Sequence, residues 1–157
     1  FYDNDFCDTV VGLLQKYGLD PSLLRLEITE SAYTDNPVQL LSVLKRLHDI
    51  GLTILMDDFG SGYSSLNMLK NVTVDILKID MGFVQNLEDS ERAPTILRRV
   101  VEMAHDLKMD VVVEGVETKA QIDFLSSIDC DKIQGYYFAK PMAREDFTAL
   151  IEKEAGR

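Results

Sequence analysis

"LMDDFGSGYSSL", residues 55–66, joins an apolar segment to two adjacent carboxylates and then to glycines and serines. The apolar residues before the carboxylates predict a buried strand, because short apolar runs between turn signals are typical of parallel sheets. In a regular strand, neighbouring side chains point to opposite faces. Asp57 and Asp58 can therefore serve one site only if the strand ends at Asp57 and the chain turns at Asp58. Gly60 and Gly62 would permit that turn.

The rest of the chain alternates strand patterns with helical ones. Apolar residues at helical spacing predict helices within residues 6–18, 36–51, 93–109, 118–125 and 144–154. Asn36 and Pro37 fit the start of the second helix, and Thr118 and Gln121 form a capping box for the fourth. Strands are predicted at residues 23–29, 52–57, 74–80, 110–115 and 131–138.

This alternation predicts an α/β fold with a parallel sheet and covering helices. Five strand–helix units are too few for a closed eight-stranded barrel. An open doubly wound sheet is therefore an alternative, and the residues at the strand ends have to decide between the two.

Every predicted strand brings a polar residue to its C-terminal end. These residues are Glu27 and Glu30, Asp57 and Asp58, Lys78 and Asp80, Glu114 and Glu117, and Gln134. Ligands of α/β folds bind at this edge of the sheet. A single aspartate there is more often a turn former or a helix cap, and Glu30, Glu117 and Gln134 have equally ordinary interpretations. Their joint occurrence, with a lysine inside an apolar strand, favours a site.

Carboxylates gathered in one cavity raise each other's pKa unless cations neutralise them. Oxygen-only ligands suit Mg²⁺ or Mn²⁺ rather than zinc. Adjacent aspartates would let one carboxylate bridge two ions, and two ions about 3.5–4 Å apart are the arrangement that promotes phosphoester hydrolysis. Lys78 could then position a water molecule or offset phosphate charge.

Composition narrows the functional classes. The 157 residues carry a net charge of -11, which argues against a nucleic-acid polymer as partner. No apolar run reaches the roughly 20 residues that span a bilayer. Cys7 and Cys130 lack metal-ligand spacing and indicate a reduced, intracellular compartment. His48 and His105 lie in helical patterns, so we expect neither to be a ligand or a catalytic base.

Five motifs, "LEITES", "DDFGSGYSSL", "LKID", "VVVEGVET" and "QGYYFAKP", follow one another along the chain. In this order and spacing they closely resemble the EAL-domain cyclic di-GMP phosphodiesterases of bacterial signalling. The resemblance covers essentially the whole chain. It implies a (β/α)8 TIM-like barrel of the EAL type, which hydrolyses one phosphodiester of cyclic di-GMP to linear pGpG with two Mg²⁺ or Mn²⁺ ions.

The resemblance also implies roles for individual residues. The metal ligands would be Glu27, Asp57, Asp58 and Glu114, with Asp57 bridging. The groups that assist catalysis would be Lys78, near the attacking water, together with Glu114 and Gln134. Glu30 and Glu117 would anchor the segment after the double aspartate. That segment, with Gly60, Ser61 and Gly62, would couple substrate and metal binding to dimerisation.

One departure concerns the family's Glu-Ala-Leu motif and a metal-binding asparagine, which lie upstream of the matching region and are not among these residues. We therefore expect residues 1–157 to be a partial EAL domain, about five of eight β/α units. Such a part would have impaired activity and would self-associate through its open sheet edges or join the missing part. We expect a homodimer in the cytoplasm, with no direct membrane contact by this segment. The segment could also be the cytoplasmic domain of a membrane-anchored protein. A sensor or GGDEF domain fused to it is a further expectation.

Two alternatives differ in class. A non-catalytic cyclic di-GMP receptor or dimerisation module would be expected to lose some catalytic residues, and Asp57, Asp58, Lys78 and Glu114 are all present. A receiver-type phosphorylation switch also combines a double aspartate, a lysine and Mg²⁺. Its acidic pair follows the first strand, whereas here the pair follows the second, so the spacing does not fit.

Overall fold

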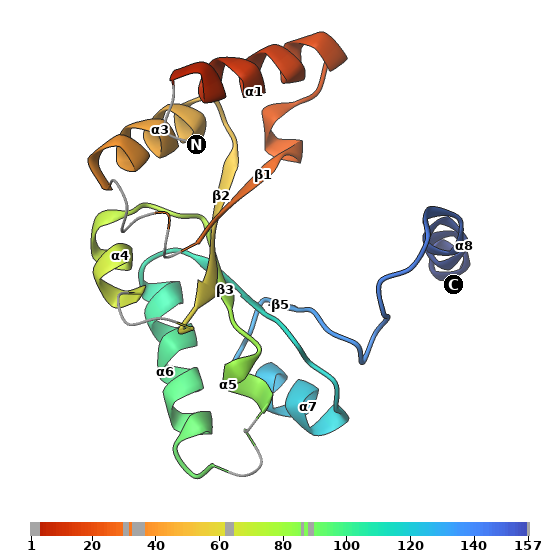
Figure 1. The fold of residues 1–157 in the computed structure, drawn as a ribbon. Coiled ribbons are helices and arrows are strands. Elements are labelled where there is room, and N and C mark those ends of the chain that lie inside the picture. Colours follow the sequence, from red (N-terminus) through yellow and green to blue (C-terminus); the bar gives the residue numbers. More distant parts are fainter. Residues whose placement is uncertain are drawn as a thin grey trace.

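A computed structural model describes residues 4–29, 32, 37–61, 65–85, 87 and 90–156 (Figure 1). The predicted alternation of strands and helices is confirmed. Along the chain the elements are α1 (Asn4–Tyr17), η1 (Pro21–Leu23), β1 (Arg25–Thr29), α3 (Pro37–Asp49), β2 (Thr53–Phe59), α4 (Ser65–Asn71), β3 (Ile76–Ile79), α5 (Gly82–Gln85), α6 (Ala93–Asp106), β4 (Asp110–Val113), α7 (Lys119–Ser127), β5 (Lys132–Ile133) and α8 (Arg144–Ala155). The sequence patterns did not predict α4 and α5, which are short helices after β2 and β3.

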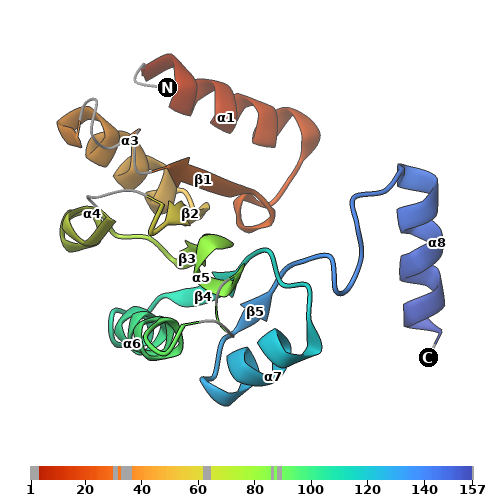
Figure 2. The same cartoon turned by 60° about the horizontal axis from the view of Figure 1, so that its bottom comes forward.

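The five strands form one parallel sheet in the order β1-β2-β3-β4-β5. A doubly wound sheet reverses its order at a switch point, whereas the strands of a barrel follow one another around the cylinder. Here the order never reverses, so the doubly wound alternative is wrong. The helices α3, α4 and α6 lie on one side of the sheet (Figure 1). In the end-on view, α8 stands apart from them, across the sheet (Figure 2).

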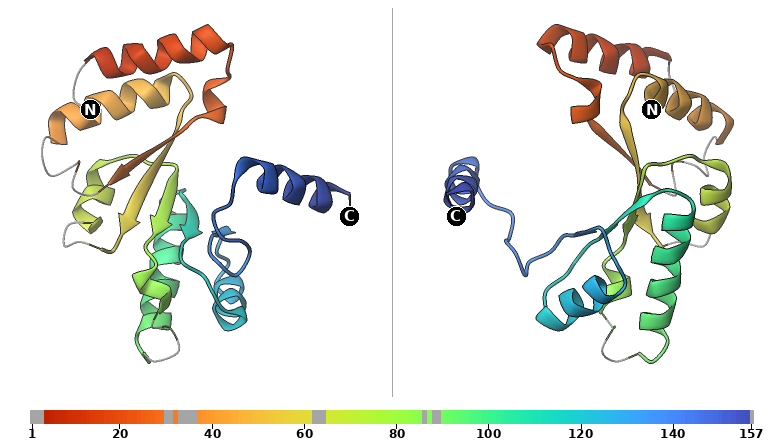
Figure 3. Two further views of the ribbon diagram at one scale, coloured as in Figure 1. Left: turned by 45° about the vertical axis from the view of Figure 1, so that its right-hand side comes forward. Right: turned by 180° about the vertical axis from the view of Figure 1, so that it is seen from behind.

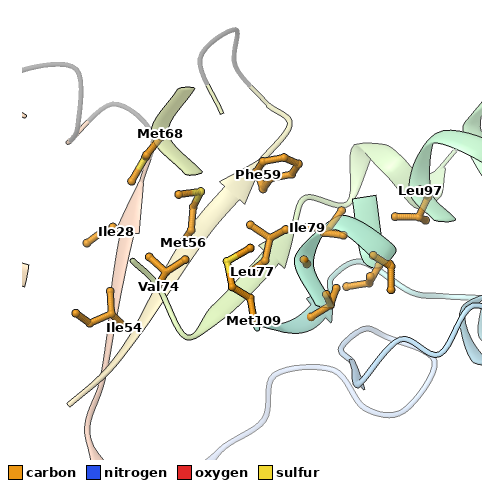
Figure 4. Close-up of a cluster of buried hydrophobic side chains, with 14 of the residues drawn as sticks. Ile28, Ile54, Met56, Phe59, Met68, Val74, Leu77, Ile79, Leu97 and Met109 are labelled. Carbon is orange, nitrogen blue, oxygen red and sulfur yellow. The ribbon is translucent and has the colours of Figure 1, made fainter. Parts of the chain in front are cut away.

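Alternation along β3 gives its two faces different chemistry. Leu77 and Ile79 are fully buried and pack with Met56 and Phe59 of β2 in the main core (Figure 4). Lys78, between them, points to the opposite face. This division, predicted from the period of a strand, is confirmed. The charged side chain thus lies on the face without the covering helices.

A β-bulge in β2 places both aspartates opposite a single lysine. Met56 pairs with Leu77 and Phe59 pairs with Ile79, so Asp57 and Asp58 together oppose Lys78. Asp58 has a φ of 56°, a left-handed conformation that aspartate tolerates better than most residues. The expectation that the strand ends at Asp57 is wrong. The strand continues to Phe59, and the bulge provides the change of direction instead.

The predicted strand 131–138 is also shorter than expected. Only Lys132–Ile133 pairs with β4. Beyond it the Tyr137 N–H donates to the Val116 carbonyl at 3.0 Å, and the Phe138 N–H donates to the Gly135 carbonyl at 3.2 Å. The second bond closes a turn, and the first joins this turn to the loop after β4. The chain then leaves the sheet toward α8, as both views in Figure 3 show.

Two side chains at α5 pack against glycines of two neighbouring loops. Phe83 lies in α5, and Met81 lies just before it. A Cβ added at Gly60, after β2, would lie 2.0 Å from Cε2 of Phe83, and one added at Gly115, after β4, would lie 2.3 Å from Cβ of Met81. Both glycines have positive φ, 94° and 71°. The loops that follow β2, β3 and β4 are therefore held against one another by close contacts that only glycine permits.

Two carboxylate–histidine pairs lie at the N-terminal ends of the strands. Oδ2 of Asp131 accepts the Val111 N–H at 2.8 Å and bonds Nε2 of His105 at 2.9 Å. Asp75 likewise accepts a backbone N–H of β2 at 2.8 Å and bonds Nε2 of His48 at 3.2 Å. Both histidines lie at the N-terminal edge of the strands, away from Lys78.

In the part of the chain that is described, no helix has the length and apolar character needed to cross a membrane.

The carboxylate of Asp131 should stabilise the fold in a pH-dependent way. Burial opposes its ionisation, but the bonds from His105 and the Val111 N–H lower its pKa below the ordinary 3.8. A lowered folded pKa means that the stabilisation is present above pH 3.8 and is lost as the pH falls through the folded value. We expect Asp131→Asn to lower the free energy of unfolding near pH 7 by about 1 kcal/mol, allowing for solvent screening, as measured by urea denaturation.

The matched control is Asp110→Asn, because Asp110 pairs with Lys132 at 3.0 Å but both side chains are substantially exposed. This control should change stability little. Equal losses for the two variants, or a loss at Asp131 that stays constant down to pH 3, would contradict the prediction.

Gly60→Ala tests the packing of the loops after β2 and β3. The added methyl group would overlap the Phe83 ring, and alanine disfavours the positive φ, so we expect the free energy of unfolding to fall by about 1–3 kcal/mol. Gly12→Ala is the control. It lies inside α1 with nothing within 4 Å of the added Cβ, and should raise stability by about 0.5–1 kcal/mol. A Gly60→Ala protein as stable as the wild type would show that Phe83 does not fix this loop.

Candidate functional site

Lys78 lies at the centre of the C-terminal edge of the sheet. Its Nζ donates to Oε1 of Glu27 at 2.9 Å, to Oδ1 of Asp57 at 2.9 Å and to Oε1 of Glu114 at 3.0 Å. The three carboxylates come from β1, β2 and the residue after β4. Parallel strands in sequential order bring these ends together. The structure therefore gathers four residues that the sequence predicted to share a site.

The charges in this cluster do not balance. The lysine side chain is 10% exposed and faces three carboxylates, with Asp58 next to them. Burial would lower the pKa of Lys78, but the bonds to Asp57, Glu27 and Glu114 hold it above its usual range. The pKa of Asp58 is raised, first by burial and then by the charges of Asp57 and Asp80. The site thus holds one fixed cation and an excess of negative charge.

The bulge and the segment after it are fixed by local bonds. The Asp58 N–H donates to Oδ1 of Asp57 at 3.0 Å. The Asp58 carbonyl accepts both the N–H of Ser61 at 3.1 Å and its hydroxyl at 2.8 Å. Gly60 lies inside this turn. The two other residues predicted for this region, Glu30 and Gly62, lie outside the described residues.

A cavity of about 820 Å³ opens beside the cluster. Its polar wall includes Asp58, Asp80, Glu114, Glu117 and Gln134, and its apolar wall includes Phe138, Met142, Phe147 and Leu150. Glu117 and Gln134 are thus brought to the same cavity as the aspartates. The anchoring role predicted for Glu117 with Glu30 is not tested, because Glu30 is not described. The sequence patterns missed the apolar wall, because its residues come from the turn after β5 and from α8.

Asp80 and Gln121 have structural bonds that explain their positions. Oδ1 of Asp80 accepts the Gly82 N–H at 2.8 Å, which starts α5, so the cap expected as its ordinary interpretation is present. Oε1 of Gln121 accepts the N–H groups of Glu117 and Thr118 at 2.8 and 2.9 Å. Nε2 of Gln121 also donates to a carbonyl of α5 at 3.0 Å. The predicted capping box is confirmed, and its glutamine additionally joins the loop after β4 to α5.

The donor atoms of the cluster fit a hard divalent cation. Glu27, Asp57, Asp58 and Glu114 offer only carboxylate oxygens, the ligands of Mg²⁺, Mn²⁺ and Ca²⁺. The described residues contain no group of three acidic, histidine or cysteine side chains that is already arranged around a metal position. In this structure the ammonium of Lys78 occupies the point on which three of the carboxylates converge.

Comparisons with known proteins identify the family of the chain. The EAL-domain family model matches residues 1–141. The chain is 40% identical to the cyclic di-GMP phosphodiesterase NbdA of Pseudomonas aeruginosa over 151 residues, 94% of this chain and 19% of that protein. It spans about a fifth of the length of the curated relatives it matches.

Solved structures show the same fold. The EAL domain of Mycobacterium smegmatis DcpA superposes with a TM-score of 0.89 and 35% identity, covering 96% of this chain and 67% of that one. Klebsiella pneumoniae BlrP1, in a complex with calcium and cyclic di-GMP, gives a TM-score of 0.83 at 33% identity, covering 90% of this chain and 36% of that one. The five-stranded sheet is thus part of the TIM-like barrel of such domains, and the chain belongs to the EAL-domain family.

Proposed function

We propose that this chain contributes to the hydrolysis of cyclic di-GMP to linear pGpG. The observation that carries the proposal is the convergence of Glu27, Asp57 and Glu114 on Lys78, in a chain that is 40% identical to the phosphodiesterase NbdA. A strained turn at Asp58 and a buried lysine are costly for a purely structural element. Both are accounted for if the cluster binds cations and a phosphodiester.

The carboxylates of Glu27, Asp57, Asp58 and Glu114 would hold two Mg²⁺ or Mn²⁺ ions. When bound, such ions supply charge neutralisation at the phosphate and a water that is easier to deprotonate. The bulge is what allows both aspartates to face the same ions, because a regular strand would separate them.

Lys78 would act as a fixed cation. Its raised pKa keeps the proton on Nζ at neutral pH in the arrangement observed, so it can donate hydrogen bonds to phosphate or to the attacking water. Gln134 offers an amide in the cavity wall, which can bond a phosphate or ribose oxygen. The apolar wall, with Phe138 and Phe147, offers surfaces on which a purine base can lie and exclude water.

We also propose that the protein is a cytoplasmic homodimer, that the segment after Asp58 couples the site to the dimer interface, and that a sensor or GGDEF domain is fused to this chain. The solved complex of BlrP1 with cyclic di-GMP supports the ligand class.

Incubation with cyclic di-GMP and Mn²⁺, followed by chromatography of the nucleotides, tests the proposed reaction. We expect pGpG to form, and Glu114→Gln to reduce its rate by at least about 100-fold, because a charged group that faces the cation and the phosphate is lost. Glu152→Gln in α8 is the control, since it removes a carboxylate from an exposed helix without changing the cluster.

Titration calorimetry with Ca²⁺ in place of Mn²⁺ separates binding from turnover. Binding without pGpG formation under either ion would favour the non-catalytic receptor. The absence of both binding and product would reject the proposed function for this chain.

A further inference from the structure

Lys78 links three strands through one atom. Glu27, Asp57 and Glu114 come from different parts of the sheet, and each bonds the same nitrogen at 2.9–3.0 Å. Any two of these oxygens are therefore no farther apart than twice that distance. Without the ammonium, carboxylates at this spacing would repel one another across a partly buried site.

The backbone that carries this nitrogen is fixed by the fold. Lys78 pairs in register with Val112 of β4 on one side, and the bulge of β2 faces it on the other. The flanking residues Leu77 and Ile79 are fully buried, so the backbone of β3 cannot shift easily. The side chain itself is a flexible four-carbon stem with a charge at its end. The charge can move while the strand stays in place.

We propose that Lys78 is an internal substitute for a divalent cation, which holds the metal-binding carboxylates together before metal arrives and must leave them when metal binds. This inference rests on the proposed function, because it takes Glu27, Asp57 and Glu114 as metal ligands. A cation held by the same oxygens would lie about 2.0–2.6 Å from them. It would then be so close to the ammonium of Lys78 that the two positive charges would repel each other strongly. Metal binding and the three lysine bonds therefore compete.

The competition has two consequences that differ in sign. Removal of the ammonium should weaken the metal-free fold, because the carboxylates lose their counter-charge. The same removal should strengthen metal binding, because the ion no longer has to displace a competitor. A lysine that merely fills space or only assists turnover would not produce both effects.

Lys78→Met tests the proposal, with Lys132→Met as the matched control. Lys132 lies on β5, which pairs with β4 and not with β3. It bonds Asp110 rather than the carboxylates of the cluster and is 44% exposed, so its replacement makes the same change in net charge without removing a bond of the cluster. The concentration of free Mn²⁺ is measured by electron paramagnetic resonance while the full 157-residue chain is titrated with Mn²⁺. Thermal unfolding is followed with EDTA and with Mn²⁺.

We expect Lys78→Met to lower the dissociation constant for Mn²⁺ by about tenfold or more, and to lower the melting temperature in EDTA. Lys132→Met should do neither. If Lys78→Met is unfolded in EDTA and Mn²⁺ restores its cooperative unfolding, the proposal is supported in its strongest form. Equal or weaker Mn²⁺ binding by Lys78→Met, or a protein that stays unfolded with Mn²⁺, would overturn it.

Failure of this inference can be told apart from failure of the proposed function. Tighter Mn²⁺ binding by Lys78→Met, together with an absence of pGpG from the wild-type chain, would keep the inference and reject the activity. Formation of pGpG with unchanged Mn²⁺ affinity in the variant would keep the activity and overturn the inference. If neither the wild type nor Lys78→Met binds Mn²⁺, the assignment of these carboxylates as metal ligands fails and the inference fails with it.

Discussion

A buried ammonium facing three carboxylates is the interaction on which the rest of this structure depends. Lysine is rarely buried without partners, because desolvation of its charge is costly. Its partners here come from β1, β2 and the end of β4. Each of these strands must lie in its observed register for its carboxylate to reach Nζ. The order of the sheet and the geometry of the charged cluster are therefore two aspects of one constraint.

The bulge reconciles that constraint with the hydrophobic core. In a regular β2, every second side chain points to the main core, starting with Ile54 and Met56. The next residue of this series would be Asp58, so a carboxylate would lie among buried apolar side chains. The extra residue puts Phe59 there instead, opposite Ile79. The left-handed conformation of Asp58 costs about 1–2 kcal/mol. The burial of Phe59 offsets that cost.

Much of this arrangement could be predicted from residue patterns, and the exceptions share a cause. Strand–helix alternation, the two faces of β3 and the capping box at Thr118 depend on short-range periodicity, which a sequence displays directly. The bulge, the early end of β5 and the contact of Phe83 with Gly60 depend on what lies across from a residue in space. Glycines after a strand indicate that a turn is possible, but they do not indicate which ring will fill the space beside them. For the same reason the second bond of Gln121, to α5, was not predictable.

The carboxylates at the N-terminal and C-terminal ends of the strands are partly buried and have different partners. At the N-terminal edge, Asp75 and Asp131 each accept a hydrogen bond from a backbone N–H and bond a histidine nitrogen, so these carboxylates have hydrogen-bond partners within the fold. At the C-terminal edge, one ammonium serves three carboxylates, and Asp58 and Asp80 add to the excess. A fold selected only for stability would have compensated both edges alike. The uncompensated edge is the one where the chain is strained at Asp58 and where a cavity opens, and this coincidence is the physical reason for proposing that this edge acts on a ligand.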